Sequence, residues 1–229
     1  MNKRYRFFSN VPDTARVGRI RDPATARVLR NTYFLLALCL GFAALTAITA
    51  VVLQWPHPGI LITLVGYFGL LFLVTKNRSS RWGLLWILAL TGFMGYTLGP
   101  VVAYYLRLPH GSETVLMALV GTATLFLAMS GIALFSRRDF SFLSNFLTTG
   151  ILVAFLAGLT AIFFDVPALS LAVSAVFVLL MSGLILYETN KVVQKGETNY
   201  IMVTVTLFVA FFNLFSSLLH LLGFAGRSE

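Results

Sequence analysis

Long apolar stretches alternate with short polar connections along the whole chain. A helix rises about 1.5 Å per residue, so about 20 apolar residues cross ~30 Å of hydrocarbon. Most of the stretches reach that length, and the second is shorter. The pattern predicts an all-α integral membrane protein with seven transmembrane helices. The predicted spans cover residues 32–53, 59–75, 82–106, 113–135, 142–164, 167–187 and 201–223.

The third span contains glycines at helical spacing, in the segment TGFMGYTLGP. Gly92, Gly95 and Gly99 share one face of a helix, where they permit close approach of a neighbouring backbone. Pro100 lacks a backbone donor and favours a kink. We therefore expect Gly95, Gly99 and Pro100 either to pack a helix pair closely or to form a hinge.

The seventh span carries small and polar residues along one face, at spacings of four, three, four and three. They are Thr206, Ala210, Asn213, Ser217 and His220. Polar groups facing lipid are unfavourable, so this stripe should face protein or water. We expect a central seventh helix surrounded by the other six. Its stripe would either form interhelical hydrogen bonds or line a polar cavity.

Basic residues fall almost entirely on one side of the spans. Of 17 Lys and Arg residues, fifteen precede residue 31 or lie in the connections after the second, fourth and sixth spans. The other side has only Arg107 and Arg227. Short loops rich in Lys and Arg stay in the cytoplasm, so the N-terminus is predicted inside and the C-terminus outside. Residues 1–31 would form a basic, flexible cytoplasmic tail, and 32–229 the membrane bundle.

The same distribution argues against several other functions. The basic residues lie where topology requires them, so nucleic-acid binding is not predicted. Cys39 is the sole cysteine, which rules out an intramolecular disulfide. His57, His110 and His220 are scattered on the outer side, and their spacing predicts no metal site. Phosphate-loop, HExxH and GxSxG motifs are missing from the sequence, so neither enzymatic activity nor a cofactor is predicted.

Glu188 is the acidic residue nearest to membrane depth on the basic side. It closes the sixth span, on the same helical face as Ser174 and Met181. An ionisable group at this depth suggests a titrating or pore-lining role. The alternative is an interfacial position with Lys191, three residues further on, as its partner.

Four segments together resemble the Bax inhibitor superfamily, in the branch described as modulators of the FtsH protease. They are VLRNTYFLLALCL at 28–40, LITLVGYFGLLFL at 61–73, TGFMGYTLGP at 91–100 and GETNYIMVTVTLFVAFFNLF at 196–215. The resemblance implies a seven-helix protein of the bacterial inner membrane that binds FtsH and its HflK/HflC partners. Such a protein is both a substrate and a competitive inhibitor of the protease. Its tail would be the handle that the protease grips, which here includes Arg4, Arg6, Arg16 and Arg19.

Other members of the superfamily resemble pH-sensitive calcium leak channels, with a pair of acids on the sixth and seventh helices. Glu188 matches the first acid, and Ala210 stands where the second would be. Two adjacent carboxylates share a proton because both cannot ionise cheaply. Without the second carboxylate, this proton-sharing pair and its response to pH are lost. A calcium leak is therefore the weaker alternative to protease modulation.

Overall fold

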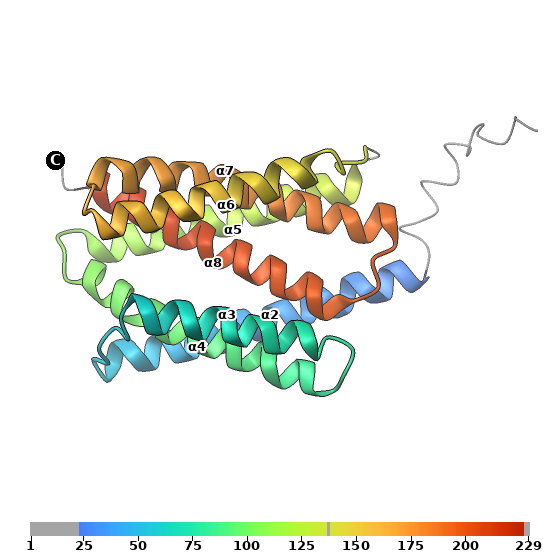
Figure 1. The fold of residues 1–229 in the computed structure, drawn as a ribbon, viewed down its shortest axis with the longest axis horizontal. Coiled ribbons are helices and arrows are strands. Elements are labelled where there is room, and N and C mark those ends of the chain that lie inside the picture. The colour runs from blue at the N-terminus through green and yellow to red at the C-terminus, as the bar shows by residue number, and fades with distance from the viewer. Residues whose placement is uncertain (1–22, 137, 227–229) are drawn as a thin grey trace, which may run out of the picture.

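The computed structural model describes residues 23–136 and 138–226, which form seven helices and no strand. The predicted all-α fold is confirmed. In chain order the helices are α2 (Pro23–Val52), α3 (Ile60–Lys76), α4 (Trp82–Leu106), α5 (Gly111–Phe135), α6 (Leu143–Phe163), α7 (Pro167–Lys195) and α8 (Tyr200–Ala225) (Figure 1).

Six of these helices are long and apolar enough to cross a membrane, and α3, with 17 residues, is shorter. Two helices extend beyond the apolar run that predicted them. Helix α2 begins at Pro23, so residues 23–31, expected in the tail, form its first turns. Helix α7 continues past residue 187 to Lys195. Hydrophobicity marks the part of a helix that suits a membrane, whereas the backbone hydrogen bonds continue through polar residues.

Helix α8 runs between two groups of helices, α2–α3–α4 and α5–α6–α7 (Figure 1). It packs chiefly on α2, α4, α5 and α7, while α3 packs on α4 and α6 on α7. In the most apolar window of α8, 56% of residues are buried, against 17% in α6. The central position of α8 therefore agrees with the sequence, but the structure differs from the expected ring of six helices around it.

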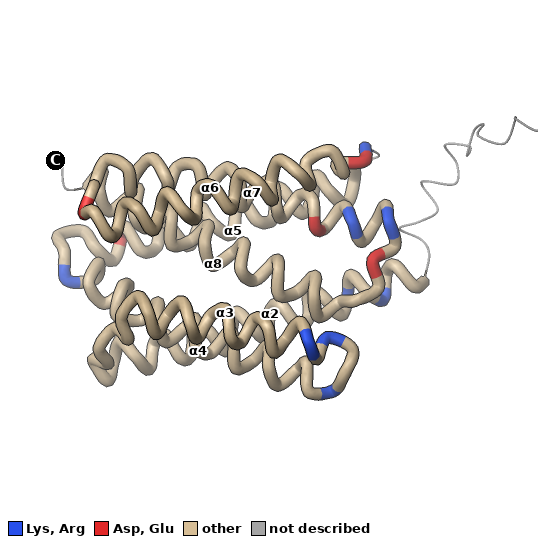
Figure 2. The backbone as a smooth tube through the Cα atoms, viewed as in Figure 1, with Lys and Arg blue, Asp and Glu red and all other residues tan. Residues whose placement is uncertain are grey.

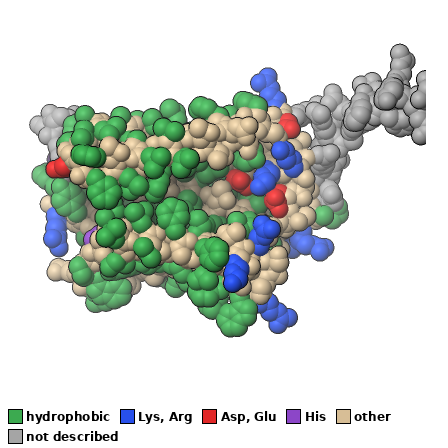
Figure 3. Space-filling model, in the orientation of Figure 1, with side chains coloured by type: hydrophobic (Ala, Val, Ile, Leu, Met, Phe, Trp, Pro, Cys, Tyr) green, Lys and Arg blue, Asp and Glu red, His purple; other side chains and the backbone are tan. Residues whose placement is uncertain are grey.

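Charged side chains gather at the ends of the bundle. Lys and Arg of the α3–α4 and α5–α6 connections and of the last turns of α7 lie at one end, whereas Arg107 follows α4 at the other end (Figure 2). Hydrophobic side chains cover much of the flank between the two ends (Figure 3). Phe34, Phe72 and Leu179, for example, are 65–74% exposed. A flank of this composition suits contact with lipid.

The glycines of α4 lie directly against α2. A Cβ atom at Gly99 would lie 2.5 Å from the Cβ of Ala50, and one at Gly95 would collide with the backbone of Ala43 and with the hydroxyl of Thr46. Helix α4 continues through Pro100 to Leu106. Close helix packing thus accounts for Gly95 and Gly99, and a hinge at Pro100 stays a prediction.

Gly95→Ala should lower the free energy of unfolding by about 1–3 kcal/mol, because the added methyl group forces α2 and α4 apart. Gly131→Ala is the matched control, since Gly131 is helical and has nothing within 4 Å of its missing Cβ. That substitution should be neutral or stabilising. Equilibrium unfolding of the purified protein in detergent measures both. Equal changes in the two variants would contradict close α2–α4 packing.

Candidate functional site

The last turns of α7 carry a charged cluster at the basic end of the bundle. Glu188 is 8% exposed. Its Oε2 atom lies 3.7 Å from Nζ of Lys191, and the same Nζ lies 3.5 Å from Oε2 of Glu197 in the α7–α8 connection. A buried carboxylate requires a counterion, which Lys191 provides. We call Glu188, Lys191 and Glu197 the Glu188 network.

Glu197 is held in its ionised form by neighbouring donors. Its Oε1 atom accepts hydrogen bonds from the backbone amides of Asn199 and Thr198, each at 3.1 Å. The Asn199 amide contributes most to lowering the pKa of Glu197, and Lys191 lowers it further. Lys191 therefore lies between two carboxylates, one on its own helix and one in the following connection, and it joins α7 to that connection.

Asn190 joins α7 to a second connection. Its side chain is almost fully buried; Oδ1 accepts from the backbone amide of Phe140 at 3.2 Å, and Nδ2 donates to the carbonyl of Arg138 at 3.1 Å. One amide group thus satisfies both a donor and an acceptor of the α5–α6 connection. Sequence reasoning missed Asn190. The only indication of its role in the sequence was its place as an uncharged amide between two charged residues, Glu188 and Lys191.

Helix α2 is tied to the same end by two hydroxyl contacts. The hydroxyl oxygens of Tyr33 and Thr189 on α7 lie 3.3 Å apart, within hydrogen-bond distance. The Thr204 hydroxyl on α8 lies 3.3 Å from the Thr32 carbonyl and 2.7 Å from the Tyr200 carbonyl. The ends of α2, α7 and α8 are therefore joined by polar contacts, beside those that hold the two connections.

The polar stripe of α8 is largely satisfied within the helix itself. Thr206 donates to the carbonyl of Met202 at 3.1 Å, and the Asn213 amide donates to the carbonyl of Val209 at 2.8 Å. Ala210 and Ser217 are buried. The stripe reaches another helix at His220, whose Nδ1 lies 2.8 Å from the Ser174 hydroxyl on α7. Of the two expected roles, interhelical hydrogen bonding is observed at this one position.

The Ser174–His220 contact also shows which part of α8 lies beside Glu188. The two helices are antiparallel; Glu188 follows Ser174 by 14 residues, and Thr206 precedes His220 by 14. Glu188 therefore lies near the level of Thr206, about one turn from Ala210. Ala210 is fully buried, so α8 presents a methyl group at the position where the sequence resemblance implied a second acid.

The remaining predicted residues do not join this cluster. His57 accepts from the backbone amide of Gly59, and His110 pairs with Glu113 at the opposite end of the bundle. Among residues 23–136 and 138–226, no three His, Cys, Asp or Glu side chains are placed to hold a metal ion. The predicted handle lies outside the described residues; it comprises Arg4, Arg6, Arg16 and Arg19.

An apolar helical bundle with its charged groups at the two ends defines a multi-pass integral membrane protein. The family model described as "Inhibitor of apoptosis-promoting Bax1" matches residues 25–227. The chain therefore belongs to the Bax inhibitor family, as its sequence resemblance predicted.

Relatives of known name support this assignment. The "Modulator of FtsH protease YccA" of Escherichia coli K12 is 48% identical over 204 residues, which cover 89% of this chain and 93% of that protein. An uncharacterized protein of Pseudomonas aeruginosa is also 48% identical, over 88% of this chain and 91% of its own length. The E. coli O6:H1 relative, with the same identity and coverage as the K12 protein, is named "Inner membrane protein YccA". The present protein is located in the bacterial inner membrane.

Lys191→Met should destabilise the bundle, by about 1–3 kcal/mol, because Glu188 loses its counterion in a nearly buried position. Lys191→Arg should retain most of the stability. Lys195→Met is the control, since Lys195 is exposed in the last turn of α7. Adding Glu188→Gln to Lys191→Met should recover part of the loss. Unfolding curves of the four variants test this, and similar losses for Lys191→Met and Lys195→Met would contradict the pairing.

Proposed function

We propose that this protein modulates an ATP-dependent membrane protease of the FtsH type by binding to it, without catalysing a reaction. The observation that carries the proposal is the 48% identity to the E. coli protein named modulator of FtsH protease. The match covers 89% of this chain and 93% of the E. coli protein. The HflK/HflC partners implied by the family resemblance are part of the same proposal.

The proposed orientation places the Glu188 network in the cytoplasm. All seven helices would cross the membrane, with the N-terminus inside and the C-terminus outside. Most of the described Lys and Arg residues lie at one end of the bundle (Figure 2), which supports this orientation because positively charged connections stay cytoplasmic. The basic end would then face the compartment in which ATP is hydrolysed.

In this orientation the N-terminal tail would be the segment gripped first. Residues 1–22, with Arg4, Arg6, Arg16 and Arg19, lead directly into α2, and α2 packs on α4 and α8. A pull on the tail would therefore act on the closely packed α2–α4 interface before it reached the other helices. Slow extraction of a bound bundle would occupy the protease, which is how a substrate acts as a competitive inhibitor.

The geometry around Glu188 gives little support to a calcium leak. Glu188 is nearly buried and its partner is a lysine, and position 210 holds a buried methyl group. A lysine beside a carboxylate opposes the approach of a divalent cation by like-charge repulsion. We therefore place protease modulation ahead of the calcium leak, for which a flux assay in liposomes with Glu188→Gln is the direct measurement.

Deletion of residues 2–20 tests the proposed mechanism, since it leaves α2 intact from Pro23 onward. The truncated protein should fold with an unchanged melting temperature. In cells its half-life should rise to the value measured in a strain that lacks the protease, because the protease can no longer grip the N-terminal tail. Pulse-chase labelling in both strains gives the two half-lives.

A second variant separates the length of the tail from its sequence. Replacing residues 2–20 with a Gly/Ser segment of equal length should restore degradation if an extended chain is sufficient for the protease. The variant should instead resist degradation if the protease recognises the basic residues. Equal half-lives for the intact and the deleted chain, in cells that contain the protease, would refute the handle mechanism.

A further inference from the structure

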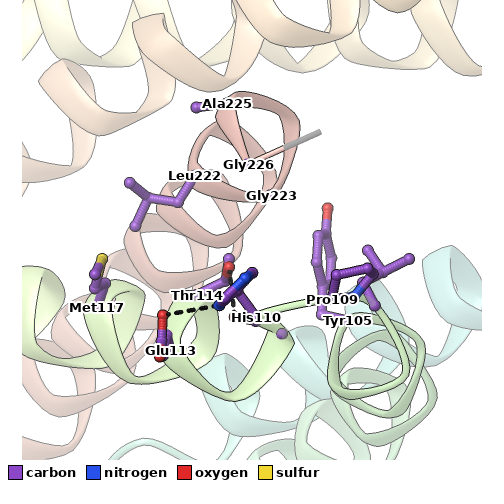
Figure 4. Close-up of a pocket in the computed structure, with 12 residues that line it drawn as sticks. Tyr105, Pro109, His110, Glu113, Thr114, Met117, Leu222, Gly223, Ala225 and Gly226 are labelled. Carbon is purple, nitrogen blue, oxygen red and sulfur yellow. Dashed lines mark hydrogen bonds and ion pairs between the residues drawn. The ribbon is translucent and has the colours of Figure 1, made fainter. Parts of the chain in front are cut away.

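A cavity of about 880 Å³ opens at the end of the bundle opposite the Glu188 network. We call it the α5–α8 cavity, because the first turns of α5 and the last turn of α8 form most of its wall, with the α4–α5 connection beside them (Figure 4). Nothing in the proposed protease modulation makes use of this cavity.

The wall of the cavity is divided between apolar and polar groups. Leu222 and Ala225 lie on α8, and His110 and Glu113 lie across from them at the start of α5, with Met117 further along α5 (Figure 4). His110 Nδ1 lies 3.4 Å from Glu113 Oε2, and the Glu113 side chain is 65% exposed. The carboxylate therefore keeps acceptor capacity for a ligand. A wall of this kind fits an amphiphile with a cationic group.

An exposed apolar face continues from Glu113 along α5 toward the middle of the bundle. Met117, Val120 and Leu127 follow Glu113 on the same helical face, and they are 58%, 56% and 69% exposed. The face begins at a carboxylate near the end of the bundle and continues along the apolar flank. A membrane lipid has the same order of groups, with a polar headgroup followed by an acyl chain.

The charges at this end select the kind of headgroup. Glu113 would attract an ammonium group. Arg107 is the sole described Lys or Arg at this end, is exposed at the end of α4, and forms no ion pair with another described residue, so it is available to a phosphate. A primary ammonium donates hydrogen bonds to a carboxylate, whereas a quaternary ammonium has no N–H to donate.

We propose that the α5–α8 cavity binds the primary-amine headgroup of a zwitterionic phospholipid, with Glu113 accepting from the ammonium group and one acyl chain lying along Met117 and Val120. The site is independent of the proposed function. Loss of lipid selectivity and loss of protease modulation can therefore be observed separately.

Native mass spectrometry of the full-length protein in detergent tests the headgroup. The probes are dioleoyl phosphatidylethanolamine and dioleoyl phosphatidylcholine, added in equal amounts. The ethanolamine adduct should predominate in the unmodified protein. Glu113→Gln should lower the ratio of the two adducts about fivefold, as expected for the loss of one charge-assisted hydrogen bond at a half-open site.

Asp165→Asn is the matched control, because Asp165 is the other described acid at this end of the bundle and does not line the cavity. It should leave the ratio unchanged. Equal adducts of the two lipids with the unmodified protein, or the same loss in both variants, would overturn the proposal. A stronger adduct with dioleoyl phosphatidylglycerol than with either lipid would also overturn it, since an anionic headgroup would not select Glu113.

The position of the acyl chain has its own test. Val120→Asn places an uncharged polar group on the apolar face below the cavity, and it should weaken both adducts without changing their ratio. Unchanged adducts in this variant would refute the acyl-chain position. Circular dichroism and melting temperatures of all three variants show whether they remain folded.

Discussion

Backbone amides and carbonyls inside a bilayer must find their partners within the protein, and this constraint shapes the whole molecule. It explains why the described chain is helical throughout its apolar regions. It also governs the side chains, because hydroxyl and amide groups within the bundle mostly donate to carbonyls of their own helix, as Thr122 and Asn213 do. Helix α8, which carries the polar stripe, has the most buried position, while α3 and α6 lie on the outside of the arrangement. Charged groups are left for the two ends.

At the basic end, the last turns of α7 hold together elements that are distant in the sequence. Asn190 fixes the α5–α6 connection, Lys191 reaches the α7–α8 connection, and Thr189 contacts α2. Glu188 is satisfied within this arrangement by a lysine. Two carboxylates that share a proton respond to pH by changing their net charge. Glu188 instead has the ammonium group of Lys191 as its partner. A nearly buried acid that is paired with a lysine on its own helix is suited to holding helices in place.

The apolar runs predicted the seven helices of the described residues, because uninterrupted apolar runs leave few alternatives in a membrane. Helix ends were less predictable. Pro23 and Lys195 lie outside the apolar runs, in positions where the helix continues without hydrophobic side chains. The glycine face of α4 was evident, but its partner α2 was not, since spacing identifies a face and not its neighbour. Asn190 escaped notice because its importance comes from two backbone groups about 50 residues away. The α5–α8 cavity could not be predicted at all, because helices distant in the sequence form it together.

The central position of α8 also has a consequence for biosynthesis. The helix on which both groups pack is the last of the described helices to be synthesised, and its buried residues extend from Ile201 to Gly223. Each of four helices, α2, α4, α5 and α7, buries a face against α8. Until α8 is inserted, these faces have no partner in the chain. Assembly of this bundle is therefore completed only after α8 has been synthesised, and until then the earlier helices remain in the membrane as partly packed groups.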